Sequence, residues 1–332
     1  MILVLTHTNG FEPDLVIDQL RARGARFARL NFDQMLAKSS ITIFQQHGVS
    51  DALMRIGKHR LRLAEVSVAW THETPLYCFD AGIPASARAI LQDETQAFVD
   101  GLCGMLSARW VNSPECIRRA SNKILQHRVA QQVGLLVPAT VVTNDPEQAR
   151  EFCEAHSGDV IMKDLNYVPR EVEGRFLGSW TKRLPDSLRS DYSAVQLTPV
   201  FLQEQIPKQH ELRITIVGQC IFAGALDSQA HDISRTDWRK YNLDQPMKKW
   251  KVNLPEDVAQ KCLALMKRLN LQFGAIDMIV TPSGGHCFLE INTTGAWGWL
   301  ERDLGFPISS AFADLLTHPG PIEEPAIAQA RG

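Results

Sequence analysis

The sequence predicts an α/β (α+β) protein built from two or three subdomains, and three observations support this prediction. The chain has 332 residues, of which 45% are hydrophobic, and this is enough for a sizeable core. Short apolar runs typical of strands alternate with segments whose apolar residues recur at helical spacing. The first three such segments follow the order strand, helix, strand, which is how a small α/β domain begins.

Residues 1–112 predict an N-terminal α/β domain. Leu15, Val16 and Leu20 lie at helical spacing, and Gly24 follows them in the position where a helix often ends. The expected order is strand, helix, strand, strand and helix, over residues 2–5, 14–23, 27–32, 66–70 and 94–106.

A domain boundary is predicted next, because Ser113 can cap a helix whose first residue is Pro114. We expect a central subdomain over 113–195, a C-terminal subdomain over 196–320 and a fraying tail over 321–332. The sequence of the central subdomain predicts a helix, a strand, a second helix and a second strand. In order, they span residues 113–133, 138–142, 145–153 and 160–163. Three strands, a helix and a two-stranded hairpin then follow, over residues 201–205, 212–217, 221–225, 255–269, 274–280 and 286–291.

Residues 164–182 predict a loop, because they are polar, contain Gly174 and Gly178 and show no apolar period. Long loops in compact domains are often active-site lids.

Composition excludes several classes of protein. The formal net charge is −2, without the basic excess of proteins that coat nucleic acid or an anionic membrane. We find no run of about 18 apolar residues and no N-terminal signal pattern, so no membrane span is expected. The seven cysteines are scattered without a CxxC pair, which argues against a zinc site and favours reduced thiols in a cytoplasmic protein.

The final hairpin predicts a metal site. Asp277 lies on its first strand, and Glu290 and Asn292 lie two residues apart on its second, so their side chains share one face. Two carboxylates and an amide oxygen are hard ligands that suit Mg²⁺, which usually keeps some waters and also binds substrate phosphates. The alternative is an edge hairpin whose acidic groups are simply solvated.

Two lysines and two arginines are candidate anion contacts. Lys163 ends an apolar strand and Lys123 lies on a predicted helix, where each ammonium could meet phosphate oxygens or merely extend over the surface. Arg213 points inward along a strand and could hold a phosphate. Arg239 follows a polar stretch and could neutralise a phosphate or orient a substrate carboxylate, unless that stretch is an ordinary surface loop.

The segment 201–213 predicts a nucleotide contact. Pro207 stops the strand just after Glu204 and Ile206, which leaves backbone groups that could bind an adenine edge. Glu211 could accept a hydrogen bond from a ribose hydroxyl. The alternative is an ordinary β-bulge. No GxxxxGK[ST], GxSxG or GxGxxG motif occurs in the positions that phosphate or acyl chemistry requires.

Taken in order, these segments resemble the ATP-grasp superfamily, in particular the microviridin-type graspetide ligases that cross-link side chains of ribosomally made peptides. The resemblance covers most of the chain. Its main segments are SNKILQHRVAQQVGLLVPATVVTNDP, IMKDL, QLTPVFLQEQIPKQHELRITIVG, DWR and FGAIDMIV…FLEINTTGAWGWLE. QEQI…ELR followed by FLEIN is fairly specific for the superfamily. ELRITIVG with DSQ, DWR and the tryptophan-bearing tail points to the peptide-ligase branch.

The resemblance implies an ATP-grasp fold, with an N-terminal pre-ATP-grasp domain, and a role for each candidate residue. The implied roles are phosphate contact for Lys123, Lys163 and Arg213, adenine hinge for Glu204 and Ile206, ribose contact for Glu211, and Mg²⁺ ligands for Asp277, Glu290 and Asn292. Residues 164–182 match the phosphate-covering lid, although they are not strongly glycine-rich. Arg170, Arg175, Lys182 and Arg183 could meet an acidic peptide there, or form a solvated charged loop.

The implied cofactors are ATP and Mg²⁺, and the implied reaction passes through an acyl phosphate to an ester or amide cross-link in a precursor peptide with acidic side chains. Two alternatives stay open. One is a ligase that adds amino acids to a free amino acid or a protein tail, and the other is a non-catalytic ATP-binding regulator. The resemblance also makes a homodimer possible. The general base is open, with Asp232 and Asp237 as candidates by charge alone.

Overall fold

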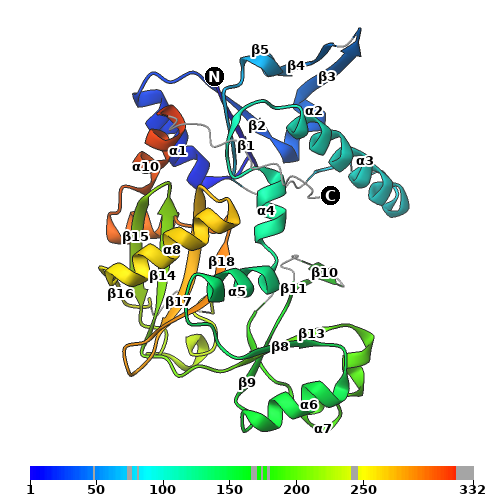
Figure 1. Cartoon of the computed structure of the whole chain (residues 1–332). Coiled ribbons are helices and arrows are strands. Elements are labelled where there is room, and N and C mark those ends of the chain that lie inside the picture. Colours follow the sequence, from blue (N-terminus) through cyan, green and yellow to red (C-terminus); the bar gives the residue numbers. More distant parts are fainter. Residues whose placement is uncertain are drawn as a thin grey trace, which may run out of the picture. The chain divides into compact units, whose positions relative to one another are not determined.

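The computed structural model describes residues 1–47, 49–72, 77–80, 82–165, 170–172, 175–177, 180–240 and 246–318. It confirms the mixed α/β class, with helices and strands alternating along the chain (Figure 1). The chain forms two compact units, one of Met1–Glu115 with the described residues from Pro307 onward, and one of Cys116–Phe306. Each unit has its own sheets and its own hydrophobic core.

A four-stranded parallel sheet forms the centre of the first unit. Its order is β2 (Phe27–Asn31), β1 (Ile2–Thr6), β6 (Val68–Thr71) and β7 (Arg109–Val111). The helices are α1 (Phe11–Ala22), α2 (Met35–Lys38), α3 (Ala85–Gly104) and α10 (Ile308–Thr317). The predicted strands are confirmed within a residue or two, but α1 and α3 begin earlier than predicted. Pro13 does not delay α1, because proline is tolerated in the first helical turn.

An antiparallel sheet in the first unit was missed by the sequence-based prediction. It consists of β3 (Ser39–Gln46), β4 (Val49–Ile56) and β5 (His59–Arg62). It places few residues in the core, among them Ala52, Met54 and Leu61. Its apolar runs are therefore short and interrupted, as is usual for a sheet with one solvated face.

Helix α10 belongs to the first unit, whereas residues 196–320 were predicted to form one C-terminal subdomain. Arg23 Nη2 lies 3.0 Å from Asp314 Oδ1, and the rings of Trp70 and Phe312 lie 5.0 Å apart between centroids. Local sequence patterns do not report this packing, because it joins the end of the chain to its beginning.

The predicted helix 113–133 is two helices, α4 (Pro114–Ala120) and α5 (Lys123–Gln132). The break occurs at Asn122, whose side-chain oxygen accepts a hydrogen bond from Leu125 N at 3.1 Å. Asparagine competes in this way with the backbone bonds of a continuing helix and is a favoured N-cap. Lys123 is therefore the first residue of α5 rather than a mid-helix residue.

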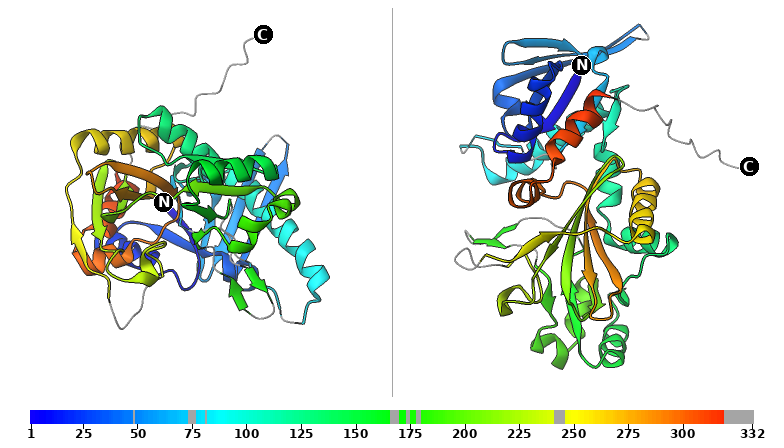
Figure 2. Two further views of the ribbon diagram at one scale, coloured as in Figure 1. Left: turned by 90° about the horizontal axis from the view of Figure 1, so that it is seen from below. Right: turned by 90° about the vertical axis from the view of Figure 1, so that its left-hand side faces the viewer.

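Two antiparallel sheets, of four and five strands, form the core of the second unit. The smaller has the order β12 (Lys182–Arg183), β9 (Val160–Lys163), β13 (Val200–Glu204) and β8 (Thr140–Thr143). The larger has the order β16 (Lys249–Lys251), β15 (Cys220–Leu226), β14 (His210–Val217), β17 (Phe273–Val280) and β18 (His286–Asn292). In Figure 2 the orange hairpin of β17 and β18 lies beside the yellow-green strands β14 and β15.

Helices pack against these two sheets. The helices are α6 (Pro146–Ala155), α7 (Asp186–Ser190), α8 (Glu256–Leu269) and α9 (Gly298–Leu304), together with α5. Cys262, Leu265 and Leu269 of α8 pack against Ile276 and Met278 of β17, as its amphipathic pattern predicts. The larger sheet is thus a rigid platform whose second face is available for polar side chains.

The predicted loop 164–182 contains short strands in its described part. Backbone bonds pair β10 (Arg170–Val172) with β11 (Arg175–Leu177), and β12 with β9. Gly174 and Gly178, the side chains of Arg170 and Arg175, and the predicted tail 321–332 lie outside what the structure describes. Among the described residues, no helix has the length and apolar character needed to cross a membrane.

Candidate active site

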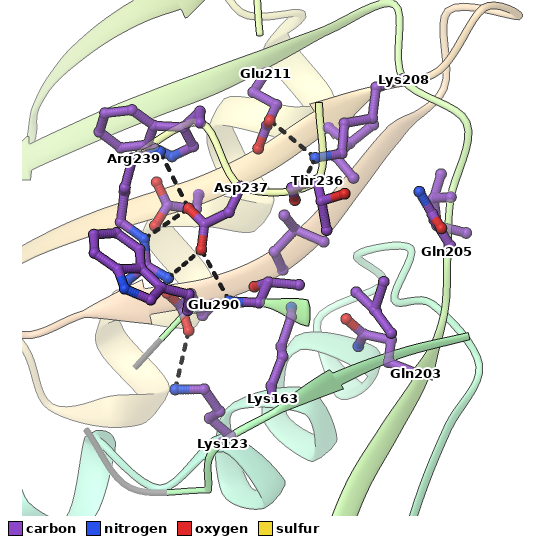
Figure 3. A pocket seen from close by; sticks show the side chains of 18 of the residues that line it. Lys123, Lys163, Gln203, Gln205, Lys208, Glu211, Thr236, Asp237, Arg239 and Glu290 are labelled. Carbon is purple, nitrogen blue, oxygen red and sulfur yellow. Dashed lines mark hydrogen bonds and ion pairs between the residues drawn. The ribbon is translucent and has the colours of Figure 1, made fainter. Parts of the chain in front are cut away.

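A pocket lies within the second unit, and nine of the ten predicted site residues line it (Figure 3). Part of the pocket is open to solvent. The nine residues are Lys123, Lys163, Glu204, Ile206, Glu211, Arg239, Asp277, Glu290 and Asn292. They are up to about 170 positions apart in sequence, so only the fold brings them together.

Arg213 is the exception, because its side chain lies behind the pocket wall. Its guanidinium donates from Nη1 to both carboxylate oxygens of Asp277 at 3.0 Å, and from Nη2 to Ala296 O at 3.0 Å. The two residues are direct partners across β14 and β17. In this structure Arg213 therefore orients Asp277 from behind.

The three proposed metal ligands lie next to one another on β17 and β18. Asp277 is the register partner of Glu290, and a register shift follows directly after Asp277. Asn292 Nδ2 donates to Asp277 Oδ2 at 2.8 Å, which leaves the amide oxygen of Asn292 available as an acceptor. Burial raises the pKa of Asp277, and the charge of Arg213 opposes that rise.

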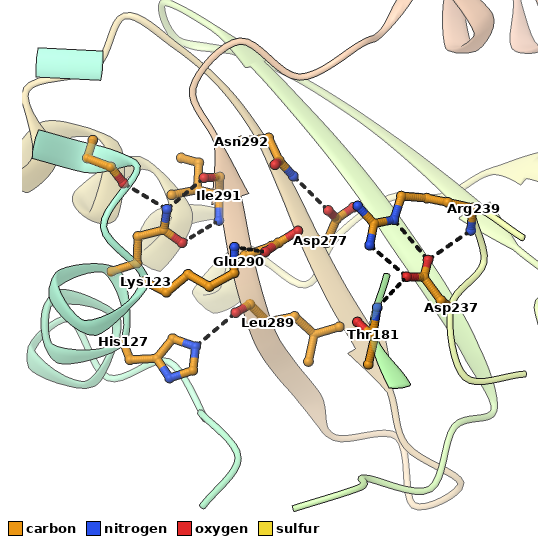
Figure 4. A network of polar contacts seen from close by, with 12 residues as sticks. Lys123, His127, Thr181, Asp237, Arg239, Asp277, Leu289, Glu290, Ile291 and Asn292 are labelled. Carbon is orange, nitrogen blue, oxygen red and sulfur yellow. Dashed lines mark hydrogen bonds and ion pairs between the residues drawn. The ribbon is translucent and has the colours of Figure 1, made fainter. Parts of the chain in front are cut away.

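Glu290 forms an ion pair with Lys123 (Figure 4). Lys123 Nζ lies 3.1 Å from Glu290 Oε2. Burial alone would raise the pKa of Glu290, but the charges of Lys123, Lys163 and Arg239 outweigh it and lower that pKa to about 2. Burial lowers the pKa of Lys163. A phosphate chain would find two ammonium groups here, next to carboxylates that could hold a divalent ion.

Helix α5 is locked onto β18 by two side chains that the sequence analysis did not single out. The amide of Gln126 exchanges hydrogen bonds with the backbone of Ile291, accepting from its N at 3.0 Å and donating to its O at 2.9 Å. His127 Nε2 lies 3.0 Å from Leu289 O, and burial lowers the pKa of this imidazole to about 4. A neutral ring that donates to Leu289 O fits both facts. Lys123 is held at Glu290 by this attachment.

The segment after β13 carries the backbone groups that are candidates to bind a base. Glu204 N donates to Ala139 O and Gln205 N to Asp159 O, each at 2.9 Å. Among the described residues we find no backbone acceptor for Ile206 N, and Pro207 then ends the strand. An unpaired N–H on the pocket wall suits the acceptor edge of a base.

Glu211 is buried beside a lysine that the sequence analysis missed. Lys208 Nζ lies 3.0 Å from Glu211 Oε1 and donates to Thr236 O at 3.2 Å. Burial raises the pKa of Glu211, while the Lys208 charge opposes the rise. Lys208 thus connects the predicted ribose contact to the loop that carries Arg239.

Asp237 holds Arg239 and the end of the predicted lid together. Arg239 Nε and Nη2 donate to the two oxygens of Asp237 at 2.9 and 2.6 Å, and Thr181 N donates to Asp237 Oδ2 at 2.9 Å. The guanidinium lies 5.3 Å from the ring centroid of Trp180. Burial favours the neutral acid, yet the bonds from Arg239 lower the pKa of Asp237. A carboxylate bound in this way is a weak base.

The other candidate base, Asp232, points to solvent. Its side chain is 89% exposed and pairs with Arg235, and it does not line the pocket. The pocket residues that the sequence analysis missed include Gln203, Lys208, Trp180 and Trp238. Gln203 and Lys208 flank the hinge in QEQIPK, so their proximity to it was the available signal.

Comparisons with known proteins agree with this arrangement. The family model described as the MvdD pre-ATP grasp domain matches residues 1–118. The crystal structure of the macrocyclase MdnC from Microcystis aeruginosa MRC superposes with a TM-score of 0.85 at 30% identity, covering 95% of this chain and 99% of that one. The RiPP-associated ATP-grasp ligase of Chryseobacterium gregarium gives a TM-score of 0.87 at 28% identity, covering 96% and 97% of the two chains.

A curated relative matches a shorter stretch. The glutathione synthetase of Thermosynechococcus vestitus is 29% identical over 199 residues, which are 58% of this chain. The chain spans 57% of the length of that relative.

Proposed function

The chain belongs to the ATP-grasp ligase family of the macrocyclase MdnC, and from this premise we propose that it uses ATP and Mg²⁺ to cross-link side chains of a ribosomally made precursor peptide. The single observation that carries the proposal is the pocket itself. The side chains that converge there include Lys123, Lys163, Asp277, Glu290 and Asn292, beside the backbone N–H of Ile206. This is the chemistry that a nucleoside triphosphate and its metal require.

The first step would transfer the γ-phosphoryl group of ATP to a carboxylate of the peptide, giving an acyl phosphate and ADP. Such a transfer needs positioning and charge neutralisation more than covalent help. Lys123 and Lys163 would neutralise the phosphate oxygens. Glu204 and Ile206 would hold the base through backbone groups, and Glu211 would accept from the ribose.

The residues present fit a magnesium ion. The described residues contain no group of three His, Cys, Asp or Glu side chains placed for a metal, so an ion here would rely on a mixed set of oxygens. Asp277, Glu290 and the amide oxygen of Asn292 supply three, and Mg²⁺ typically completes its shell with water and phosphate oxygens. When bound, the ion would supply positive charge that neutralises the phosphate oxygens.

The second step would displace phosphate from the acyl phosphate by an amine or hydroxyl of the same peptide. The peptide would lose one carboxylate oxygen to the phosphate and form an amide or ester. Arg239, positioned by Asp237, is the cation we assign to the substrate carboxylate. Residues 164–182 would exclude water as a lid, since an acyl phosphate hydrolyses readily.

The peptide partner is proposed from the relatives. The MdnC structure contains the precursor peptide MdnA, and the C. gregarium ligase contains ADP with a leader and core peptide. An acidic core segment would suit a pocket edged by Arg239 and Lys208. We further propose a homodimer, and a reducing, cytoplasmic setting consistent with seven free cysteines.

The test combines ADP release with mass spectrometry. Purified protein is incubated with MgATP and with any precursor peptide that is encoded beside its gene. We expect ADP to form together with a peptide mass loss of about 18 Da, the mass of one water. ADP formation with two joined substrates would instead indicate an amino-acid or tail ligase. Nucleotide binding without turnover on that peptide would indicate a regulator and overturn the proposal.

A further inference from the structure

Lysine side chains of the edge strand β16 share a face with the pocket. β16 ends the larger sheet, and β15 is the strand that pairs with it among the described residues (Figure 1). Lys249 is the register partner of Leu226, which in turn is the partner of Glu211 in the pocket wall. Directly opposite residues point to the same face. Lys249, and Lys251 two positions on, therefore lie on the pocket face, two strands or about 10 Å from the backbone of Glu211.

The outer edge of β16 carries backbone groups that can pair with another strand. Val252 N donates to Ala223 O at 3.0 Å, so Val252 turns its backbone groups toward β15. Backbone direction alternates along a strand, so the N–H and C=O groups of Lys249 and Lys251 point away from β15. We find no backbone partner for them in the part of the chain that the structure describes. Such an edge is a template for an added strand.

The edge is also basic. Lys248, Lys249 and Lys251 are three of four consecutive residues. Lys249 Nζ lies 2.5 Å from Asp303 Oδ2, whereas no described acid pairs with Lys251, which is exposed and lies 4.9 Å from the ring centroid of Phe306. Lysines on an edge strand discourage pairing with a neutral or basic strand, including β16 of a second copy. An acidic strand would instead place opposite charges side by side.

Two tryptophans connect this edge to the pocket. Lys249 Nζ lies 5.1 Å from the ring centroid of Trp299. The rings of Trp299 and Trp238 lie 5.6 Å apart between centroids, and Trp238 lines the pocket together with Arg239. All of these residues belong to the second unit. A peptide held at β16 can therefore continue across large, rigid aromatic surfaces to the pocket.

We propose that an acidic, extended segment of the peptide substrate binds along β16 as an added strand, which brings the reacting carboxylate toward the pocket. The inference rests on the proposed ligase function and names the surface that holds the peptide. Main-chain bonds to Lys249 and Lys251 would hold an extended segment of any sequence, and the lysine charges would select an acidic one. A peptide fixed in this way reaches the pocket at a higher effective concentration.

Fluorescence anisotropy with synthetic peptides tests this inference without requiring turnover. The probe is a labelled peptide of alternating glutamate and threonine, and its neutral match alternates glutamine and threonine. The whole chain should bind the glutamate peptide about 10-fold more tightly than the neutral one, and added salt should reduce that ratio. A glutamate peptide that is N-methylated at every residue keeps its charge but has no backbone donors. It should bind about 10-fold more weakly than its parent.

A charge reversal locates the binding on β16. Lys251→Glu should weaken binding of the glutamate peptide by about 10-fold, and should strengthen binding of a matching peptide of lysine and threonine. Lys267→Glu is the matched control, because Lys267 is exposed on α8 and does not line the pocket. It changes the net charge by the same amount and should keep the wild-type affinities.

Four results would each overturn the inference. They are no binding of the glutamate peptide, equal binding of the glutamate and neutral peptides, equal binding of the N-methylated peptide and its parent, and equal effects of the two charge reversals. None of them touches the ligase proposal, because ADP release tests that proposal separately. Binding on β16 without ADP release would overturn the ligase proposal, on which the inference rests.

Discussion

Lys123 Nζ lies 3.1 Å from Glu290 Oε2, so a residue assigned to the nucleotide phosphates is paired with a residue assigned to the metal. The pair is partly buried, with side chains 16% and 18% exposed. A bound phosphate would attract the Lys123 ammonium away from the carboxylate. A bound Mg²⁺ would in the same way attract the Glu290 carboxylate away from the ammonium. The ion pair keeps both groups in place until the ligands arrive.

Replacing the lysine should therefore impair phosphoryl transfer. We expect Lys123→Met to lower kcat/KM for ATP in the ADP-release assay by about 100-fold, the usual effect of removing one charge-stabilising group. Lys261→Met is the matched control, because Lys261 pairs with Asp257 on α8 and does not line the pocket. It should stay within about twofold of wild type. Equal effects of the two substitutions would contradict the role of Lys123.

The metal assignment predicts the response to loss of the acidic and amide ligands. Glu290→Ala and Asn292→Ala should each raise the Mg²⁺ concentration for half-maximal ADP release by about 10-fold or more. Chelation should abolish turnover in wild type, and excess Mg²⁺ should restore it. Asp303→Ala removes an acid that pairs with Lys249 and does not line the pocket, and should leave the Mg²⁺ titration unchanged. Full ATP turnover by both ligand variants would rule out the assignment.

The contact between Gly295 and Arg213 predicts a steric effect. A Cβ at Gly295 would lie 2.5 Å from Arg213 Nη2, 2.7 Å from Asn292 Cβ and 2.9 Å from Ala275 Cβ. Gly295→Ala should therefore displace Arg213 from Asp277, lower stability by about 1–3 kcal/mol and reduce ATP turnover. Gly101→Ala is the control, because a Cβ added at Gly101 in α3 would have nothing within 4 Å.

The control substitution should raise stability rather than lower it. Alanine is favoured over glycine inside a helix by roughly 0.5–1 kcal/mol, so Gly101→Ala should raise the thermal midpoint. Wild-type turnover in Gly295→Ala would show that Asp277 does not depend on Arg213 for its position.

The hydrogen bonds between Asp237 and Arg239 predict a separate effect on binding of the peptide substrate. Asp237→Asn keeps the shape but cannot bind the guanidinium through two anionic oxygens. We expect KM for the peptide to rise by about 10-fold or more while KM for ATP changes little. Asp232→Asn, at a side chain that is 89% exposed, should leave both constants unchanged. An increase confined to KM for ATP would assign Arg239 to the phosphates instead.

The sequence predicted which residues gather at the pocket better than it predicted what each one touches. Residue type and strand spacing were sufficient to group Asp277, Glu290 and Asn292, because side-chain alternation on strands is a local property. The partner of Arg213 could not be predicted, since it depends on the register between β14 and β17. Register is set by long-range packing and turn geometry that a single strand does not encode.

In the fold, too, features set by local sequence were predicted, and features set by tertiary packing or single side-chain bonds were not. Strands with continuous apolar runs, such as β1 and β17, were predicted closely because both faces are buried. The antiparallel sheet of β3, β4 and β5 was missed because only one face enters the core. The break between α4 and α5 depends on one side-chain bond of Asn122, and helical periodicity continues across such a break.

The buried imidazole of His127 predicts how stability depends on pH. Its pKa is lowered from 6.5 to about 4 by burial, so the unfolded chain binds this proton more readily than the folded chain does. The contribution of neutral His127 to the free energy of unfolding is therefore fully present above about pH 6.5, and it is lost as the pH falls toward about 4. Between pH 7.5 and 5 this one group should cost about 2 kcal/mol of the free energy of unfolding.

Urea unfolding of wild type and His127→Gln at the two pH values isolates this contribution from the other titrating groups. Glutamine can still donate to Leu289 O but cannot take up the proton, so the variant should lose about 2 kcal/mol less than wild type. The variant should also be less stable than wild type at pH 7.5, because the ring contacts of His127 with Phe201 and Phe288 are lost. Parallel pH profiles for the two proteins would show that His127 is not held neutral in the folded chain.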